Sequence, residues 1–189
     1  MHNHREELTA ATSGRRGPTS ELDECVVTTR PKVHSHIIKR PRLTNLLDES
    51  EARIILLCAP AGYGKTTLAR EWIERLHQPS GWYAGGKEML DYAALASGLA
   101  RALAELGLPP HAANLLAARA AKHDLPSILG RELAALLSAQ VGGILIVDDY
   151  HESPESSESE ELLRAFVESS TVRILLTSRA RPSWLAKKL

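Results

Sequence analysis

The sequence has few of the features that mark secreted, membrane or nucleic-acid-binding proteins. Among 189 residues there are only two cysteines, Cys25 and Cys58, and they have neither metal-ligand spacing nor support as a disulfide. No apolar run reaches membrane-spanning length, and no hydrophobic signal core follows the polar N-terminus. Lysine and arginine balance aspartate and glutamate at 23 each, so bulk charge does not favour DNA or membrane binding. These absences favour a cytoplasmic protein without a membrane partner.

Length and composition fit one globular domain preceded by a polar leader. The apolar fraction of 43% and the charged fraction of 24% are ordinary values for a folded domain. Residues 1–35 are polar and show no hydrophobic periodicity, which predicts a disordered or loosely attached leader. Residues 36–189 contain the apolar runs, and we expect them to form the folded domain.

The most informative segment is an apolar run, residues 53–58, which leads into a glycine-containing turn. The turn over residues 59–67 reads APAGYGKTT, and a helical pattern over 66–76 follows it. A strand, a turn of small residues and a helix form the layout of a phosphate-binding loop, whose backbone N–H groups surround an anion. We expect this loop to bind nucleotide through Ala61, Gly62, Tyr63, Gly64, Lys65, Thr66 and Thr67. The Tyr63 side chain is expected to pack rather than to take part in chemistry.

The loop departs from the pattern G-x-x-x-x-G-K-[ST] at its first glycine, where this chain has Ala59. Alanine fits only if that position does not need a positive φ. The alternative is a strand–turn–helix connection in which Gly-Lys-Thr arose by chance. The rest of the sequence must decide between the two interpretations.

Further strands and helices alternate along the chain. We expect strands at 81–84, 144–149 and 172–177, and helices over 45–50 (capped by Thr44), 89–106, 111–122, 125–140 and from Ser153 onward. The acidic serine run over 152–161 is expected to be a helix start and a solvated face. This order predicts an α/β fold, a three-layer P-loop NTPase core with a parallel sheet.

Charged residues follow the strands at the edge where ligands bind in such sheets. Asp148 ends an aliphatic run, and we expect it to hold Mg²⁺ together with Thr66. Asp149 is a candidate to activate water, and Arg179 is a candidate to sense or stabilise phosphate charge. The alternatives are acids that cap a strand and an ordinary surface arginine. The convergence of these residues on one edge favours the nucleotide interpretation over chance.

Three segments together resemble the nucleotide-binding domain of MalT-type, large LuxR-family regulators, which belong to the STAND class of signal-transduction ATPases. They are APAGYGKTT over 59–67, ILIVDDYH over 144–151 and ILLTSR over 174–179. The resemblance implies that Ala59 is a family trait. It also implies that Lys65, Thr66 and Thr67 bind phosphate, that Asp148 and Asp149 form the acidic pair, and that Arg179 is the sensor arginine. The segment IKRPRL over 38–43 resembles a motif near the nucleotide base, which makes Arg40 and Arg42 candidate contacts.

The resemblance implies a domain that switches between ADP and Mg-ATP states and hydrolyses ATP slowly at most. It further implies a truncated member, because the chain ends ten residues after Arg179, without the sensor and DNA-binding domains. The class has the strand order 5-1-4-3-2, and only four strands are predicted here. We therefore expect the strand at 53–58 to lie at an exposed edge, which is an aggregation risk. Two alternatives stay open: a small-molecule or nucleotide kinase on the same core, and a non-catalytic remnant that self-associates or pairs with a longer homologue.

Overall fold

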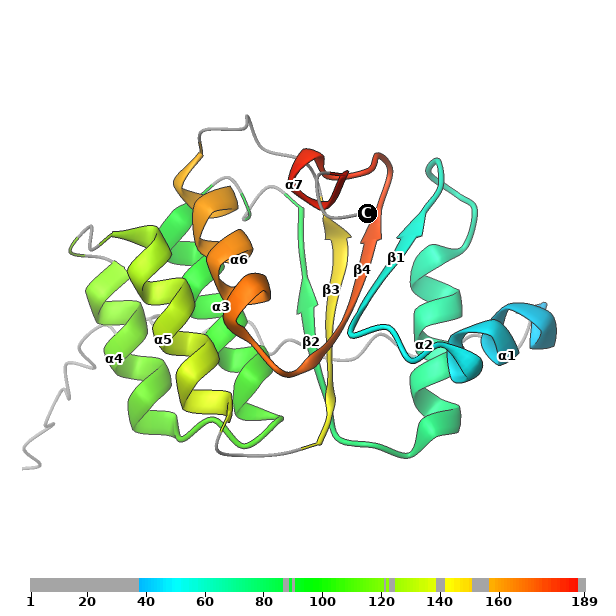
Figure 1. The fold of residues 1–189 in the computed structure, drawn as a ribbon, viewed down its shortest axis with the longest axis horizontal. Helices are drawn as coiled ribbons and strands as arrows, with labels where there is room; N and C mark the ends of the chain where they lie inside the picture. Colours follow the sequence, from blue (N-terminus) through cyan, green and yellow to red (C-terminus); the bar gives the residue numbers. More distant parts are fainter. Residues whose placement is uncertain are drawn as a thin grey trace, which may run out of the picture.

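Parallel strands form the central layer of the computed structural model, which describes residues 38–86, 89, 91–120, 122, 125–138, 142–150 and 157–186 (Figure 1). The strands of the described chain are β1 (Ile54–Cys58), β2 (Ser80–Ala84), β3 (Ile144–Tyr150) and β4 (Arg173–Ser178). They lie in the order β1-β4-β3-β2, and each neighbouring pair is parallel. The predicted α/β class and the parallel sheet are confirmed.

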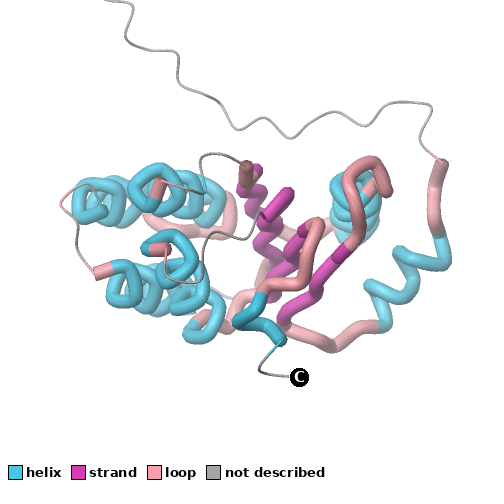
Figure 2. The backbone as a smooth tube through the Cα atoms, turned by 90° about the horizontal axis from the view of Figure 1, so that it is seen from above, coloured by secondary structure: helices cyan, strands magenta, loops and turns pink. Residues whose placement is uncertain are grey.

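Helices cover both faces of this sheet. They are α1 (Pro41–Glu49), α2 (Lys65–Leu76), α3 (Tyr92–Ala104), α4 (Pro110–Ala120), α5 (Pro126–Ser138), α6 (Glu158–Ser169) and α7 (Ser183–Ala186). Helices α3 to α6 lie on one side of the sheet and α1 and α2 on the other, as two views show (Figures 1 and 2). We call these sides the four-helix face and the α1–α2 face. No helix among the described residues is long and apolar enough to cross a membrane.

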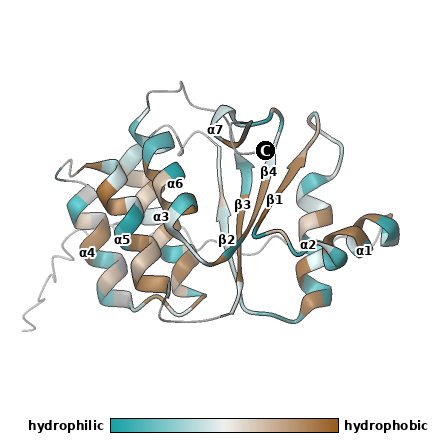
Figure 3. Ribbon diagram, in the orientation of Figure 1, coloured by the Kyte–Doolittle hydropathy of each residue, from teal (hydrophilic) through white to brown (hydrophobic). Residues whose placement is uncertain are grey.

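Alternation along the strands divides the apolar core between the two faces. On β3, Leu145 and Val147 join the cluster under the four-helix face, while Ile144 and Ile146 join the cluster under α2. All four side chains are buried, as expected of strands that are covered on both faces. Apolar colour runs along β1 and β4, whereas the carboxyl end of β3 is hydrophilic (Figure 3).

The strand that precedes the phosphate loop lies at an edge of the described sheet. β1 pairs with β4, from Ile54 opposite Ile174 to Cys58 opposite Ser178, and its other side has no partner strand among the described residues. The predicted edge position is therefore confirmed. Such an edge exposes backbone N–H and C=O groups that another strand can pair with.

The start of α1 differs from the prediction. We expected Thr44 to cap a helix over 45–50, but the helix begins at Pro41 and Arg40 is its N-cap residue. Proline is tolerated at the first helical position because its missing N–H would have had no helical partner there. Thr44 therefore lies inside the helix, where its hydroxyl donates to the Pro41 carbonyl oxygen at 3.1 Å.

The acidic serine run is only partly as predicted. The expected helix start at Ser153 and the leader over 1–35 lie outside the described residues. Helix α6 has Ser157 as its N-cap, whose Oγ accepts from the Glu160 N–H at 3.2 Å. The expected solvated face is wrong for Ser159 and Glu160, which are buried. They are buried because the first turn of α6 packs into the four-helix layer.

Candidate functional site

The loop over residues 59–67 adopts the conformation that its glycines allow. Gly62 has φ +80° and Gly64 has φ +76°, left-handed values that cost little only for glycine. Gly64 is also the N-cap residue of α2, so the loop opens directly into that helix. Ala59 is not among the residues with positive φ. Alanine is therefore compatible with the turn, which removes the objection raised by the missing glycine.

The ammonium group of Lys65 lies against the backbone of its own loop. Its Nζ donates to the carbonyl oxygens of Ala59 at 2.8 Å and Pro60 at 3.1 Å. The loop forms one wall of a pocket of about 550 Å³ at the carboxyl ends of the strands. The pocket is lined by Ala61, Gly62, Gly64, Lys65, Thr66, Thr67, Ala84, Gly85, Asp148, Asp149 and Arg179. It thus contains most of the residues that the sequence singled out.

The threonine of the loop and the acid of β3 are in direct contact. Thr66 Oγ1 donates to Asp148 Oδ1 at 2.9 Å, although the two residues are 82 positions apart. Asp148 is buried, and it is one of the residues that line the pocket. The structure therefore brings together the two residues that we expected to share a metal ion.

Thr177 on β4 is a member of the site to which sequence reasoning gave no role. Its Oγ1 donates to Asp148 Oδ1 at 2.6 Å and accepts from the Asp149 N–H at 2.8 Å. The side chain is fully buried. A threonine at the end of an apolar strand gives no signal of this role, because the contact depends on how β3 and β4 are aligned.

Asp149 and Arg179 form an ion pair, and both line the pocket. Arg179 Nε lies 3.8 Å from Asp149 Oδ1, and the two side chains are 55% and 44% exposed. An ion pair this long and this exposed contributes little stability, because water screens it. Asp149 has φ +53°, at a shift in the β3–β4 register between Val147 and Tyr150. Both charged side chains therefore line the pocket, and the ion pair between them contributes little stability.

Neither Arg40 nor Arg42, the residues expected near the nucleotide base, is among those that line the pocket, although Arg40 contacts the loop. Arg40 Nη1 donates to the Tyr63 carbonyl oxygen at 2.9 Å, and the Arg40 N–H donates to Glu71 Oε2 at 3.3 Å. Arg42 is exposed on α1. The Tyr63 side chain is 62% exposed, so the expectation that it packs is wrong. Neither apolar cluster of the described residues includes Tyr63.

The pocket offers oxygen ligands of the kind that Mg²⁺ prefers. The Asp148 carboxylate and the Thr66 hydroxyl are hard donors in direct contact. No group of three or more histidine, cysteine, aspartate or glutamate side chains among the described residues could hold a metal by itself. The donor set therefore fits an ion that keeps water and phosphate oxygens as its other ligands.

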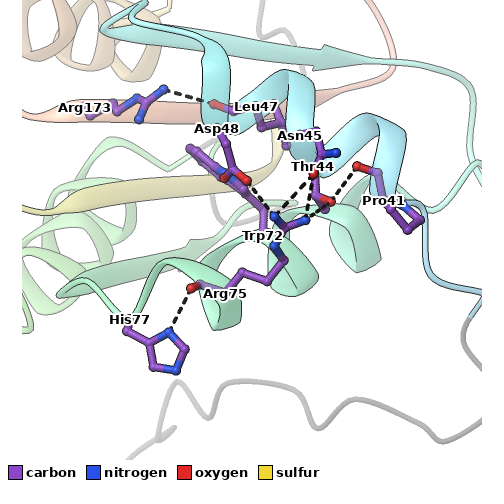
Figure 4. Close-up of polar contacts among 9 residues, drawn as sticks. All are labelled: Pro41, Thr44, Asn45, Leu47, Asp48, Trp72, Arg75, His77 and Arg173. Carbon is purple, nitrogen blue, oxygen red and sulfur yellow. Dashed lines mark hydrogen bonds and ion pairs between the residues drawn. The ribbon is translucent and has the colours of Figure 1, made fainter.

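Polar contacts fasten α1 to the helix that follows the loop (Figure 4). Asp48 accepts from Trp72 Nε1 and from Arg75 Nη2, both at 2.8 Å. The Arg173 guanidinium lies 5.1 Å from the centre of the Trp72 ring. It also donates to the carbonyl oxygens of Leu47, Ser50 and Ala52. We call Asp48, Trp72, Arg75 and Arg173 the α1 clasp. Sequence reasoning did not find these contacts.

Comparison with known proteins agrees with this geometry. Residues 47–181 match the family model described as an AAA domain. The chain is 31% identical over 160 residues to the HTH-type transcriptional regulator MalT of Vibrio campbellii, which is 82% of this chain and 17% of that protein. The MalT proteins of Vibrio parahaemolyticus and Vibrio cholerae are 30% and 29% identical, again over 82% of this chain and 17% of theirs. The chain thus spans about a sixth of the length of these relatives.

Proposed function

The chain belongs to the AAA domain family, and on that premise we propose that it binds Mg-ATP and Mg-ADP as a conformational switch. It would serve a MalT/LuxR-type transcriptional regulator in the cytoplasm. Hydrolysis would be slow at most. Among the described residues we identify no DNA-binding element, so promoter contacts would come from another part of such a regulator.

The observation that carries this proposal is the contact between Thr66 and Asp148. A glycine-containing loop with Lys65 occurs by chance more readily than a loop whose next residue lies 2.9 Å from a buried acid on a distant strand. Both side chains line the same pocket as the Lys65 ammonium. A site for phosphate and a divalent cation explains why these three groups converge there.

Five side chains that line the pocket have a role in this proposal. Lys65 neutralises the outer phosphates, while the loop and the N-terminus of α2 offer N–H groups to them. Thr66 and Asp148 would hold Mg²⁺, which would neutralise phosphate charge. The Asp149 carboxylate orients a water for attack on the γ-phosphate, and Arg179 stabilises the charge that develops there.

Replacement of the loop lysine tests the site. We expect Lys65→Ala to weaken binding of a fluorescent ATP analogue at least tenfold, because a hydrogen bond between charged groups contributes about 1.5–3 kcal/mol. Lys122→Ala is the matched control, since Lys122 is exposed and is not among the residues that line the pocket. Equal affinity of the Lys65 and Lys122 variants would contradict the proposal.

Hydrolysis is tested separately from binding. We expect Asp149→Asn to leave affinity nearly unchanged and to lower phosphate release from ATP by about 10²–10⁴-fold, the usual contribution of a general base. Asparagine tolerates the left-handed backbone of this position, so the fold should survive.

Phosphate release from ATP in water, without any acceptor molecule for the phosphate, would argue against the kinase alternative. Release at an equal rate from the variant would remove Asp149 from the catalytic role.

No strand among the described residues pairs with the outer edge of β1. This edge motivates the remaining alternative, a remnant that acts only by pairing with a longer homologue or with itself. Thermal unfolding of the isolated chain at several protein concentrations distinguishes the nucleotide switch from this remnant. A cooperative transition of the monomer that Mg-ATP shifts upward supports the switch. A transition that depends on protein concentration and ignores Mg-ATP supports pairing.

A further inference from the structure

The hydroxyl of Thr177 joins the two acids of the site. A threonine hydroxyl has one proton to donate and lone pairs to accept with. Here the proton goes to Asp148 Oδ1 at 2.6 Å, and a lone pair takes the Asp149 N–H at 2.8 Å. One buried oxygen atom thus contacts the carboxylate of the first acid and the backbone of the second.

The backbone at Asp149 needs such a partner. The β3–β4 pairing shifts between Val147 and Tyr150, so Asp149 has no Cα partner on β4. Its φ of +53° lies in the left-handed region, which costs a non-glycine residue about 1–2 kcal/mol. A side-chain acceptor for the Asp149 N–H offsets part of that cost and stabilises this conformation.

Both hydroxyl groups that reach Asp148 end on the same oxygen. Thr66 and Thr177 each donate to Oδ1, at 2.9 and 2.6 Å, while neither of these hydrogen bonds uses Oδ2. Two donors from different elements fix the rotation of the carboxylate more firmly than one donor would. Groups that orient a metal-binding carboxylate in this way typically change metal affinity 10–100-fold when they are lost.

We propose that Thr177 is a positioning residue whose hydroxyl sets the magnesium-binding carboxylate of Asp148 and the backbone of Asp149 in one arrangement. It acts through these two acids and does not touch nucleotide. The inference rests on the proposed function, since it assigns the two acids to ion binding and water activation. Its consequence is that magnesium affinity and the placement of Asp149 are lost together when the hydroxyl is removed.

The test uses two substitutions that separate the hydroxyl from the shape of the side chain. Thr177→Val keeps the shape and removes the hydroxyl, and Thr177→Ser keeps the hydroxyl and removes the methyl. Ser178→Ala is the matched control. Ser178 is the next residue along β4 and is also buried, and its hydroxyl donates to the Tyr150 carbonyl oxygen at 2.9 Å and not to Asp148 or Asp149.

Affinity for a fluorescent ATP analogue is measured for each protein with Mg²⁺ and with EDTA. We expect Thr177→Val to reduce the gain in affinity due to Mg²⁺ by about 10–100-fold, and the Thr177→Ser and Ser178→Ala variants to keep that gain. Amide hydrogen exchange at Asp149, measured by NMR without nucleotide, should accelerate in Thr177→Val alone. Thermal unfolding shows whether each variant is folded.

The outcomes separate this inference from the proposed function. If wild type binds no nucleotide, the proposed function fails and the inference fails with it. If wild type gains affinity from Mg²⁺ and Thr177→Val keeps that gain, only the inference is overturned. If Thr177→Val does not fold, the folded Thr177→Ser variant, which retains the hydroxyl, decides. A loss of the Mg²⁺ effect in Thr177→Ser overturns the inference. Retention of the Mg²⁺ effect, together with slow amide exchange at Asp149, supports the inference.

Discussion

The two faces of the sheet are covered by different means. Under the four-helix face, the described residues form an apolar cluster of 27 buried side chains, drawn mainly from α3, α5, α6 and the strands. Under the α1–α2 face the corresponding cluster has 10 members. The smaller cluster is supplemented by the α1 clasp and by the Arg70 guanidinium, which lies 5.8 Å from the Trp82 ring centre. One face is therefore held mainly by apolar burial and the other by guanidinium groups as well.

This difference matters because the phosphate loop continues into α2, on the face with the smaller core. Apolar packing is non-directional and tolerates small shifts poorly, since interiors are close-packed. Fewer buried apolar side chains hold the helices of the α1–α2 face, and segments with few such contacts open locally at lower free energy. We therefore expect α2 and α1 to exchange amide protons faster than α3, α5 and α6, and nucleotide to slow exchange mainly in α2.

The largest effect is expected on the four-helix face. Phe166 on α6 is fully buried in the larger cluster, and Phe166→Ala should lower the free energy of unfolding by about 3–5 kcal/mol through lost burial and a cavity. Leu136→Ala on α5, where the side chain is 41% exposed, should change it by less than about 0.5 kcal/mol. Urea unfolding measures both. Similar losses would mean that apolar burial does not hold this face.

An intermediate effect is expected at the α1 clasp. Arg173→Met keeps an apolar stem and removes the donors to Leu47, Ser50 and Ala52, so we expect a loss of about 1.5–3 kcal/mol. Arg164→Met is the matched control, because Arg164 is 55% exposed and its ion pair among the described residues is with Glu168 of the same helix. Hydrogen exchange in α1 should accelerate in the first variant alone. A loss no larger than that of the control would contradict the role of the clasp.

The smallest effect is a gain in stability at the end of α2. His77 has φ +51° at the C-cap, and its Nδ1 lies 2.8 Å from the Arg75 carbonyl oxygen. Glycine adopts this conformation without a side-chain penalty, so His77→Gly should raise the free energy of unfolding by about 0.5 kcal/mol. Urea unfolding of this variant and of His77→Ala, which keeps the penalty, separates the backbone effect from the lost side-chain contact. A gain in both variants would refute the backbone explanation.

Much of the fold could be predicted because its signals are local. Apolar runs gave the four strands to within one or two residues, and the glycines of the turn gave the phosphate loop. The prediction of α1 failed because Pro41 fits both an extended segment and a first helical position. The Tyr63 side chain was misjudged because an aromatic residue in a tight loop gives no local sign of which way it points.

The sequence by itself determined the phosphate loop, the acids at the end of β3 and the alternation that buries the strands. These features depend on residues close together in the chain, where backbone freedom, turn preference and apolar spacing act directly. Only the tertiary structure decided that Thr177 joins Asp148 to Asp149 and that Arg173 holds α1. Those contacts join residues 28 to 126 positions apart in the chain. They depend on strand register and on how α1 packs against β4, which no local pattern encodes.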